Sequence, residues 1–318
     1  GMSTRHIAAT RVESGVASNG VAFRQGVMAV ASGMHDMVLV GGAEKMTDLD
    51  DVSINSVMDS SADADWEAGM GVTLASNYAM IANRMIHEGI ATREEIASVS
   101  VNSHFHGALN PLAQFRKAVP IETVLRSGAV ASPLGMFDCA PISDGAAALV
   151  LCPLEDAKKY TDSYVKVAAC TQASDTLALF QREDITTFGA TVEAASRAYS
   201  LAGIKASDID VAEVHDDFTV AGLMAYADLG FSKKEEAGKA FLNGDTHYDA
   251  GKIAINTSGG LKARGYPIGA AGVAAIAEVA DQLRNRADKR QVKDAKYGLA
   301  QSTGGNGSSV TVSILEAI

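Results

Sequence analysis

The stretch VESGVASNGVAFRQGVMAVASGMHDMVLVGGAEKM, residues 12–46, decides how the rest of the chain is interpreted. A helix over residues 17–32 would be apolar on nearly every face, which is typical of a buried helix. Gly33 suits the left-handed position just after such a helix. The continuous apolar run 37–40 then predicts a strand buried on both faces. Together these features indicate an interior helix and an interior strand of an α/β protein.

The rest of the chain alternates between strand and helix patterns around one long insertion. The order of strand, small-residue loop, apolar helix, strand and Gly-Gly occurs at residues 7–42 and 253–305, which indicates two similar halves. We predict an N-terminal half at 1–157, with an acidic subdomain inserted at about 46–135, and a C-terminal half at 158–318. The predicted strands are 7–13, 146–151, 165–169, 210–214, 253–255, 297–301 and 309–315, and the further helices are 188–202, 218–229 and 269–285.

Composition excludes several classes of protein. The chain has 318 residues, 47% of them apolar, and a net charge of −11, which argues against a nucleic-acid or anionic-lipid surface. No run of 18 apolar residues predicts a membrane span. Cys139, Cys152 and Cys170 lack metal spacing, and we expect reduced thiols buried in strands of a cytoplasmic protein, with Cys139 at a strand end. The seven scattered histidines predict no metal site.

Four segments in register carry a family resemblance. Besides residues 12–46, they are FDCAPISDGAAALV at 137–150, EVHDDFT at 213–219 and SGGLKARGYPIGAAG at 258–272. They resemble the nucleophile elbow, the last strand region of the N-terminal half, the His-Asp-Cys-Phe motif and the Gly-His-Pro stretch of the thiolase superfamily. The similarity is to sterol-carrier-protein-type thiolases and acetyl-CoA acetyltransferases. It implies a five-layer α-β-α-β-α sandwich of two duplicated α/β halves, with a loop domain over the active site.

The resemblance also implies that the chain begins late and that its N-terminal half is incomplete. The predicted strand at 7–13 leads directly into the elbow, so two central strands of the first sheet are expected to be missing. Either a gene model or cloned fragment begins at an internal Met, or another polypeptide supplies these strands. The remaining sheet would then expose edges and apolar surface. In the family the strand matching 7–13 pairs across a two-fold axis, so we expect a homodimer.

Three side chains on which thiolase chemistry depends are replaced. The position matching the nucleophilic cysteine is Val16, which cannot be ionised or acylated. The Gly-His-Pro histidine is Tyr266, and a phenol with a pKa of about 10 is a poor base for a thiol but a competent proton donor. The second cysteine is Asp217, which titrates near neutrality only if burial raises its pKa. We therefore expect no thiolysis.

Other positions of the family's site are kept in whole or in part. The resemblance implies that His215 donates Nε2–H to the thioester oxygen as part of an oxyanion hole. Gly304 and Gly305 match the glycine-rich turn that lines the acyl pocket, where backbone N–H groups can bind an oxyanion. His104, close to Asn102, lies near the Asn-His pair of the thiolase loop domain, and we expect it to contact substrate.

The combined replacements favour a different reaction on the same kind of substrate. Tyr266 also resembles the tyrosine of thiolase-like aldolases of steroid side-chain breakdown, which cleave a C–C bond without an acyl-enzyme. Cleaving a β-hydroxyacyl-CoA needs a base for the β-hydroxyl proton and donors for the thioester enolate. His215, Asp217 and Tyr266 can fill these roles, and either of the last two could be the base. The alternatives are an acyltransferase and a non-catalytic acyl-CoA-binding subunit.

The resemblance also suggests what the protein binds. Coenzyme A is expected as part of the substrate, and no cofactor is expected to be bound permanently. Sterol-carrier-protein-type thiolases and thiolase-like aldolases often work with a small accessory protein that has an OB fold and a zinc ribbon. Such a protein is therefore a possible partner.

Overall fold

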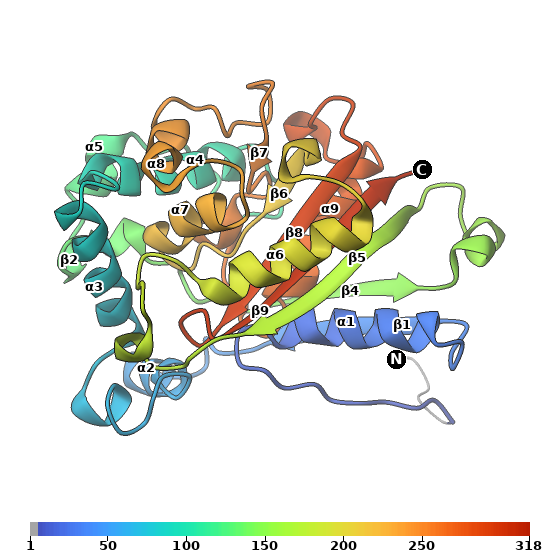
Figure 1. The fold of residues 1–318 in the computed structure, drawn as a ribbon, viewed down its shortest axis with the longest axis horizontal. Helices are drawn as coiled ribbons and strands as arrows, with labels where there is room; N and C mark the ends of the chain where they lie inside the picture. Colours follow the sequence, from blue (N-terminus) through green and yellow to red (C-terminus); the bar gives the residue numbers. More distant parts are fainter. Residues whose placement is uncertain (1–5) are drawn as a thin grey trace.

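The computed structural model describes residues 6–318, and its centre is a five-stranded sheet in the C-terminal half (Figure 1). The strand order is β5-β9-β8-β6-β7, in which β6 is parallel to β7 and β8, while β9 is antiparallel to both of its neighbours. The strands are β5 (Val165–Ser174), β6 (Val211–Glu213), β7 (Ala254–Ile255), β8 (Tyr297–Gly304) and β9 (Ser309–Ala317).

Helices cover both faces of this sheet and a second, smaller sheet follows. Helix α6 (Gly189–Ala202) lies on one face, while α1 (Ser18–Ala31) and α9 (Ala271–Leu283) lie on the other. Beyond α1 and α9 lies an antiparallel pair, β1 (Val38–Glu44) and β4 (Gly145–Leu151), with Val40 opposite Leu149. The described residues thus form four successive layers of an α/β sandwich.

The polypeptide between β1 and β4 forms a helical unit at one end of the sandwich, beside α7 (Thr219–Asp228) and α8 (Lys234–Leu242) (Figure 1). It contains α2 (Asp51–Asp59), α3 (Leu74–His87), α4 (Arg93–Gly107), α5 (Ile121–Leu125), and the short strands β2 (Ala129–Ala131) and β3 (Leu134–Gly135). Single helical turns complete the chain: η1 (Ala68–Met70), η2 (Met136–Asp138), η3 (Leu154–Lys159), η4 (Leu179–Gln181), η5 (Ala206–Asp208), the π-helical η6 (Gly260–Arg264) and η7 (Asp288–Arg290).

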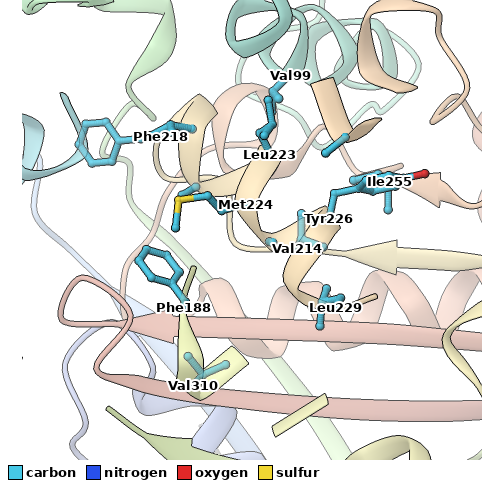
Figure 2. Close-up of a cluster of buried hydrophobic side chains, with 14 of the residues drawn as sticks. Val99, Phe188, Val214, Phe218, Leu223, Met224, Tyr226, Leu229, Ile255 and Val310 are labelled. Atoms are coloured by element: carbon cyan, nitrogen blue, oxygen red, sulfur yellow. The ribbon is translucent and has the colours of Figure 1, made fainter. Parts of the chain in front are cut away.

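The largest apolar core joins the helical unit to the central sheet. Figure 2 shows Phe218, Met224 and Phe188 following one another from the α7 region towards Val310 of the sheet. Val99 of α4 reaches the same cluster. Because the helical unit and the sheet both contribute residues to this core, the helical unit is packed against the end of the sheet at which β6 finishes.

Most predicted elements of the C-terminal half are confirmed within a few residues, including α6, α7, α9 and β5 to β9. The predicted helix at 17–32 is also present, and Gly33 after it has the expected left-handed φ of +72°. The spacing of Thr92 and Glu95 predicts a capping box, and both of its hydrogen bonds are formed at the start of α4.

The N-terminal half departs from the sequence predictions in three ways. Residues 7–13 are mostly exposed and form no strand within the chain. Strand β1 is not buried on both faces: Leu39 is 55% exposed, and so is its cross-strand partner Val150 at 62%. In helix α1 the fully buried residues all lie between Ser18 and Gly26, and beyond them Met28 is 47% exposed. The exposure of Leu39 and Val150 follows because no described residues cover the outer face of the β1–β4 pair.

The cysteine prediction is wrong in part. All three thiols are free and half-buried, but only Cys170 lies in a strand. Cys139 follows η2 and is joined to Phe218 by an isolated β-bridge, whereas Cys152 comes just after β4. Cys139 and Cys152 therefore occupy less regular positions than an apolar strand pattern suggests.

Candidate active site

The elbow before α1 brings Val16 into the interior. Gly15 has a φ of +56°, and Ser18 N–H donates to its carbonyl, so the chain turns sharply into the helix. Val16 is 7% exposed and packs in an apolar cluster with Tyr266 and Leu261. A thiolate here would lie at the positive end of a helix. The isopropyl group instead makes this wall of the site apolar.

His215 lies just beyond the carboxyl end of β6. Its backbone N–H donates to Gln301 Oε1 at 2.9 Å, which ties it to β8. Its Nε2 is 3.3 Å from the Tyr266 hydroxyl, and the two rings meet edge to face at 5.6 Å. The same Nε2 is 3.8 Å from Asp217 Oδ2. All three predicted catalytic side chains therefore converge on one nitrogen.

Tyr266 is carried by a turn that a buried carboxylate holds in place. Glu213 accepts hydrogen bonds from the Ser258 N–H at 2.9 Å and hydroxyl at 2.5 Å, and lies 3.5 Å from Arg264. The backbone of Tyr266 is fixed by its N–H donating to Pro141 O at 3.1 Å. Hydrogen bonds thus fix the backbone both at Ser258 and at Tyr266, and the segment between these two residues positions the phenol.

Burial sets the protonation states of the three side chains. The pKa of His215 falls to about 3, chiefly because burial disfavours the imidazolium and secondly because of the Arg264 charge, so the ring is neutral. Burial raises the pKa of Tyr266 well above 10. It also raises the pKa of Asp217 to about 7, while the Phe218 N–H and the Lys262 charge act in the opposite direction. Asp217 is therefore the group that titrates near neutrality.

A narrow cavity of about 10 Å³, roughly the room that one water molecule needs, lies beside this cluster, and it is lined by Asp217 but not by His215 or Tyr266. Its walls include four residues of the predicted site: Val16, Asp217, and the adjacent Gly304 and Gly305. Gly304 packs against the elbow so closely that a Cβ on it would lie 2.9 Å from the Ala17 nitrogen. Glycine is therefore required for the approach of the turn to the elbow.

Four polar residues of this cavity were not predicted: Ser61, Tyr78, Thr303 and Asn306. Tyr78 comes from α3, is 1% exposed, and stacks on Phe218 with ring centroids 4.4 Å apart. Its hydroxyl hydrogen-bonds to Asp217. Asn306 lies in the turn after β8 and is 3% exposed. None of these residues belongs to one of the four motifs, although an Asn between glycines does indicate a turn.

His104 and Asn102 lie outside the cavity walls. His104 is 5% exposed and its ring packs near Phe115 and Phe137, at centroid distances of 5.9 and 5.5 Å. Burial lowers its pKa to about 4. Asn102 is engaged in the fold, since it donates to Ile255 O at 2.9 Å and accepts from Thr246 at 3.0 Å. These contacts make Asn102 a brace between α4 and the β7 region.

Cys139 offers no replacement nucleophile. Its Sγ is 3.5 Å from Gly135 O, and burial raises the pKa of the thiol. It does not line the cavity that contains Val16.

A surface hollow of about 670 Å³ elsewhere on the molecule holds none of the predicted site residues. Its cations are already paired, Arg84 with Glu88 and Lys234 with Asp184, both at 2.5 Å. Residues 6–318 contain no group of three His, Cys, Asp or Glu side chains arranged to hold a metal ion. None of the helices in that range is long and apolar enough to cross a membrane.

Comparison with known proteins gives this site its context. A family model described as "Thiolase, N-terminal domain" matches residues 2–155, and one described as "Thiolase C-terminal domain-like" matches residues 171–317. An acetyl-CoA acetyltransferase of Methanothermobacter thermautotrophicus is 50% identical over 308 residues, which cover 97% of this chain and 80% of that protein. The chain belongs to the thiolase superfamily.

Two further relatives of this thiolase-superfamily chain are informative. Sterol carrier protein 2 of Oryctolagus cuniculus is 38% identical over 222 residues, which cover 68% of this chain and 40% of that protein. The solved structure of an "Ltp2-ChsH2(DUF35) aldolase" matches with a TM-score of 0.83 and 28% identity, covering 95% of this chain and 78% of that one. The superfamily therefore contains both transferases and an aldolase that resemble this chain.

Proposed function

We propose that this protein cleaves or forms the Cα–Cβ bond of a β-hydroxyacyl-CoA. The observation that carries the proposal is that Asp217 and Tyr266 meet at His215 Nε2, and the apolar Val16, whose position resembles that of the thiolase nucleophile, is buried nearby. A lyase step of this kind requires a base and hydrogen-bond donors but no nucleophile. The same arrangement does not suit thiolysis, which requires a thiolate.

The pKa values favour Asp217 as the base. A carboxyl group with a pKa of about 7 is half ionised at neutral pH. A phenol whose pKa lies well above 10 holds its proton under the same conditions, so Tyr266 acts as a donor. His215 is neutral and lies 3.3 Å from that phenol, and the pair supplies a hydrogen bond to the thioester oxygen as it gains enolate charge.

The bond changes balance without another reagent. Asp217 takes the proton of the β-hydroxyl group, whose oxygen becomes the carbonyl oxygen of a ketone or aldehyde. The Cα–Cβ bond breaks and its electron pair remains on Cα as the enolate of the shortened thioester. A proton delivered to Cα completes that product. Coenzyme A enters and leaves as part of the thioester, and the chain's residues bind it without a permanent cofactor.

An acyltransferase is the second candidate, supported by the 50% identity to an acetyl-CoA acetyltransferase. A non-catalytic acyl-CoA-binding subunit is the third. We also propose an accessory partner with an OB fold and zinc ribbon, because the name of the similar aldolase includes a DUF35 component. A cytoplasmic homodimer that pairs through residues 7–13 completes the proposal, and light scattering of the purified protein tests the dimer.

The test is incubation of the purified full chain with a panel of β-hydroxyacyl-CoA thioesters, with products identified by mass spectrometry. We expect a shortened acyl-CoA and a carbonyl product, and a loss of at least about 100-fold in Tyr266→Phe. Tyr199→Phe is the matched control, since that half-buried phenol donates to Leu229 O at 2.7 Å outside the cavity. CoA-dependent thiolysis by the unaltered protein would support the acyltransferase. Binding of acyl-CoA without turnover would support the silent subunit.

A further inference from the structure

Asn306 is a buried amide that the fold itself does not use. It is 3% exposed, and among the described residues neither its Oδ1 nor its Nδ2 has a hydrogen-bond partner. Its φ of +52° places it in the left-handed region, between Gly305 at +54° and Gly307 at +89°. Proteins rarely bury both ends of an amide without partners. A molecule that completes these hydrogen bonds would explain why the side chain is kept inside.

The side chain lies in the wall of the cavity that contains Asp217. The other polar side chains of that wall already have partners. Thr303 accepts a hydrogen bond from Gln301 at 2.9 Å, and Tyr78 is bonded to Asp217. Asn306 is thus the polar group of this wall whose donors and acceptor are all free. Its amide and the Asp217 carboxyl group are available to one small polar atom entering the cavity.

We propose that Asn306 and Asp217 together form the subsite for the oxygen on the β-carbon of the acyl chain. The inference rests on the proposed lyase function and adds to it the group that selects a β-oxygenated thioester. Asp217 accepts the hydroxyl proton, and Asn306 Nδ2–H donates to the same oxygen. When the hydroxyl group becomes a carbonyl, that oxygen keeps its hydrogen bond from Asn306.

The pairing gives a physical basis for substrate selection. A thioester without a β-oxygen leaves the Asn306 amide without a hydrogen-bond partner and brings the Asp217 carboxyl group no hydroxyl proton to accept, in a cavity of about 10 Å³. Sites built to hydrogen-bond a substrate oxygen reject analogues that lack it for this reason. Val16 adds an apolar side chain to the lining, and Asn306 is the lining amide whose donors and acceptor are free among the described residues.

Binding of two non-reacting thioethers tests the subsite independently of turnover. S-(3-hydroxybutyl)-CoA carries the β-hydroxyl group and S-butyl-CoA lacks it, and neither can form a thioester enolate. Titration calorimetry of the full chain should show that the hydroxylated ligand binds at least about tenfold more tightly. In Asn306→Gly, whose backbone conformation glycine adopts without strain, the preference should fall to about threefold or less. Affinity for S-butyl-CoA should stay unchanged.

Two further variants make the result decisive. Asn285→Gly is the matched control, because Asn285 also has a positive φ, +55°, but is exposed at the end of α9, and it should keep the preference. Asn306→Asp keeps a residue tolerated at positive φ yet removes the donor, so it should also lose the preference.

Each remaining outcome decides a proposal. Equal binding of both thioethers by the unaltered protein, or a full preference in both Asn306 variants, overturns the subsite. A clear preference without cleavage of any β-hydroxyacyl-CoA leaves the subsite standing and overturns the lyase. If neither thioether binds, both proposals are overturned.

Discussion

Replacing Asp217 with Asn should make the protein more stable and less active at the same time. The carboxyl group is 5% exposed, and its pKa rises from an ordinary 3.8 to about 7, mainly because burial disfavours the charged form. Each unit between the folded and unfolded pKa corresponds to about 1.4 kcal/mol. Ionised Asp217 therefore destabilises the fold by on the order of 4 kcal/mol, which the isosteric amide avoids.

The sign of the pH dependence follows from linkage. Below about pH 4 Asp217 is protonated in both the folded and the unfolded state, so it carries no penalty. Between that pH and about 7 the unfolded chain releases its proton first, and the stability of the folded state falls. Above about pH 7 the penalty is complete. The stability gain of Asp217→Asn should accordingly be absent at low pH, grow across this window and level off above it.

Thermal unfolding at a series of pH values measures this gain. At about 2–4 °C per kcal/mol, a penalty on the order of 4 kcal/mol means that the Tm of the variant should exceed that of the unaltered protein by roughly 8–16 °C at pH 8. Cleavage of the substrate should fall by about 10²–10⁴. Asp228→Asn is the matched control: burial raises the pKa of Asp228 to about 7 as well, but it accepts the Phe188 N–H at 2.8 Å away from the cavity. That variant should gain stability and keep its activity.

Two results would refute the reasoning. A Tm difference for Asp217→Asn that is the same at pH 4 and pH 8 would mean that burial does not raise the pKa of this carboxyl group. Full cleavage activity in the same variant would mean that Asp217 is not the base.

Two other predictions concern the same cavity. Val16→Cys should not produce an acetoacetyl-CoA thiolase, because Tyr266, with a pKa well above 10, cannot deprotonate the new thiol; consumption of acetoacetyl-CoA at a thiolase-like rate would contradict this. Tyr78→Phe removes a hydrogen bond that lowers the pKa of Asp217, so the acidic limb of kcat/KM should move to higher pH. If activity falls but the acidic limb of the pH profile of kcat/KM does not move, Tyr78 only packs against Phe218.

The C-terminal half could be predicted well because its elements depend on local patterns. Strands β8 and β9 are buried almost throughout and pair with one another over their whole lengths, so their apolar runs carry a clear signal. In the N-terminal half the helix at 17–32 and the strand at 146–151 were predicted as well, but the burial of β1 was not, because it depends on whether another layer covers that strand. In β4 exposed and partly buried residues alternate, with Val150 outward and Leu149 inward. The apolar sequence of this strand does not predict the alternation, because it arises from the lack of a covering layer among the described residues.

The candidate site shows the same division. Family motifs led to Val16, His215, Asp217 and Tyr266, and the fold brings them together from the elbow, β6 and the η6 turn. Tyr78 was not predicted because it reaches the cavity from α3 of the insertion and belongs to none of the four motifs. Its role depends on stacking against Phe218, a contact 140 residues away along the chain (218 − 78) that spacing alone cannot reveal.

The balance of forces on Asp217 argues that the cavity is a working site. Burial alone would keep the carboxyl group protonated, and burial is the largest influence on its pKa. Three groups oppose it: the Phe218 N–H at 2.9 Å, the Lys262 charge and the Tyr78 hydroxyl. Lys262 is itself 1% exposed, and its Nζ has no hydrogen-bond partner in the described chain, so it is costly to keep. A cavity without function would be expected to hold apolar residues at these positions, as it does at Val16. The combined effect of the three opposing groups instead holds one carboxyl group at a pKa of about 7, which is the value that suits a base at neutral pH.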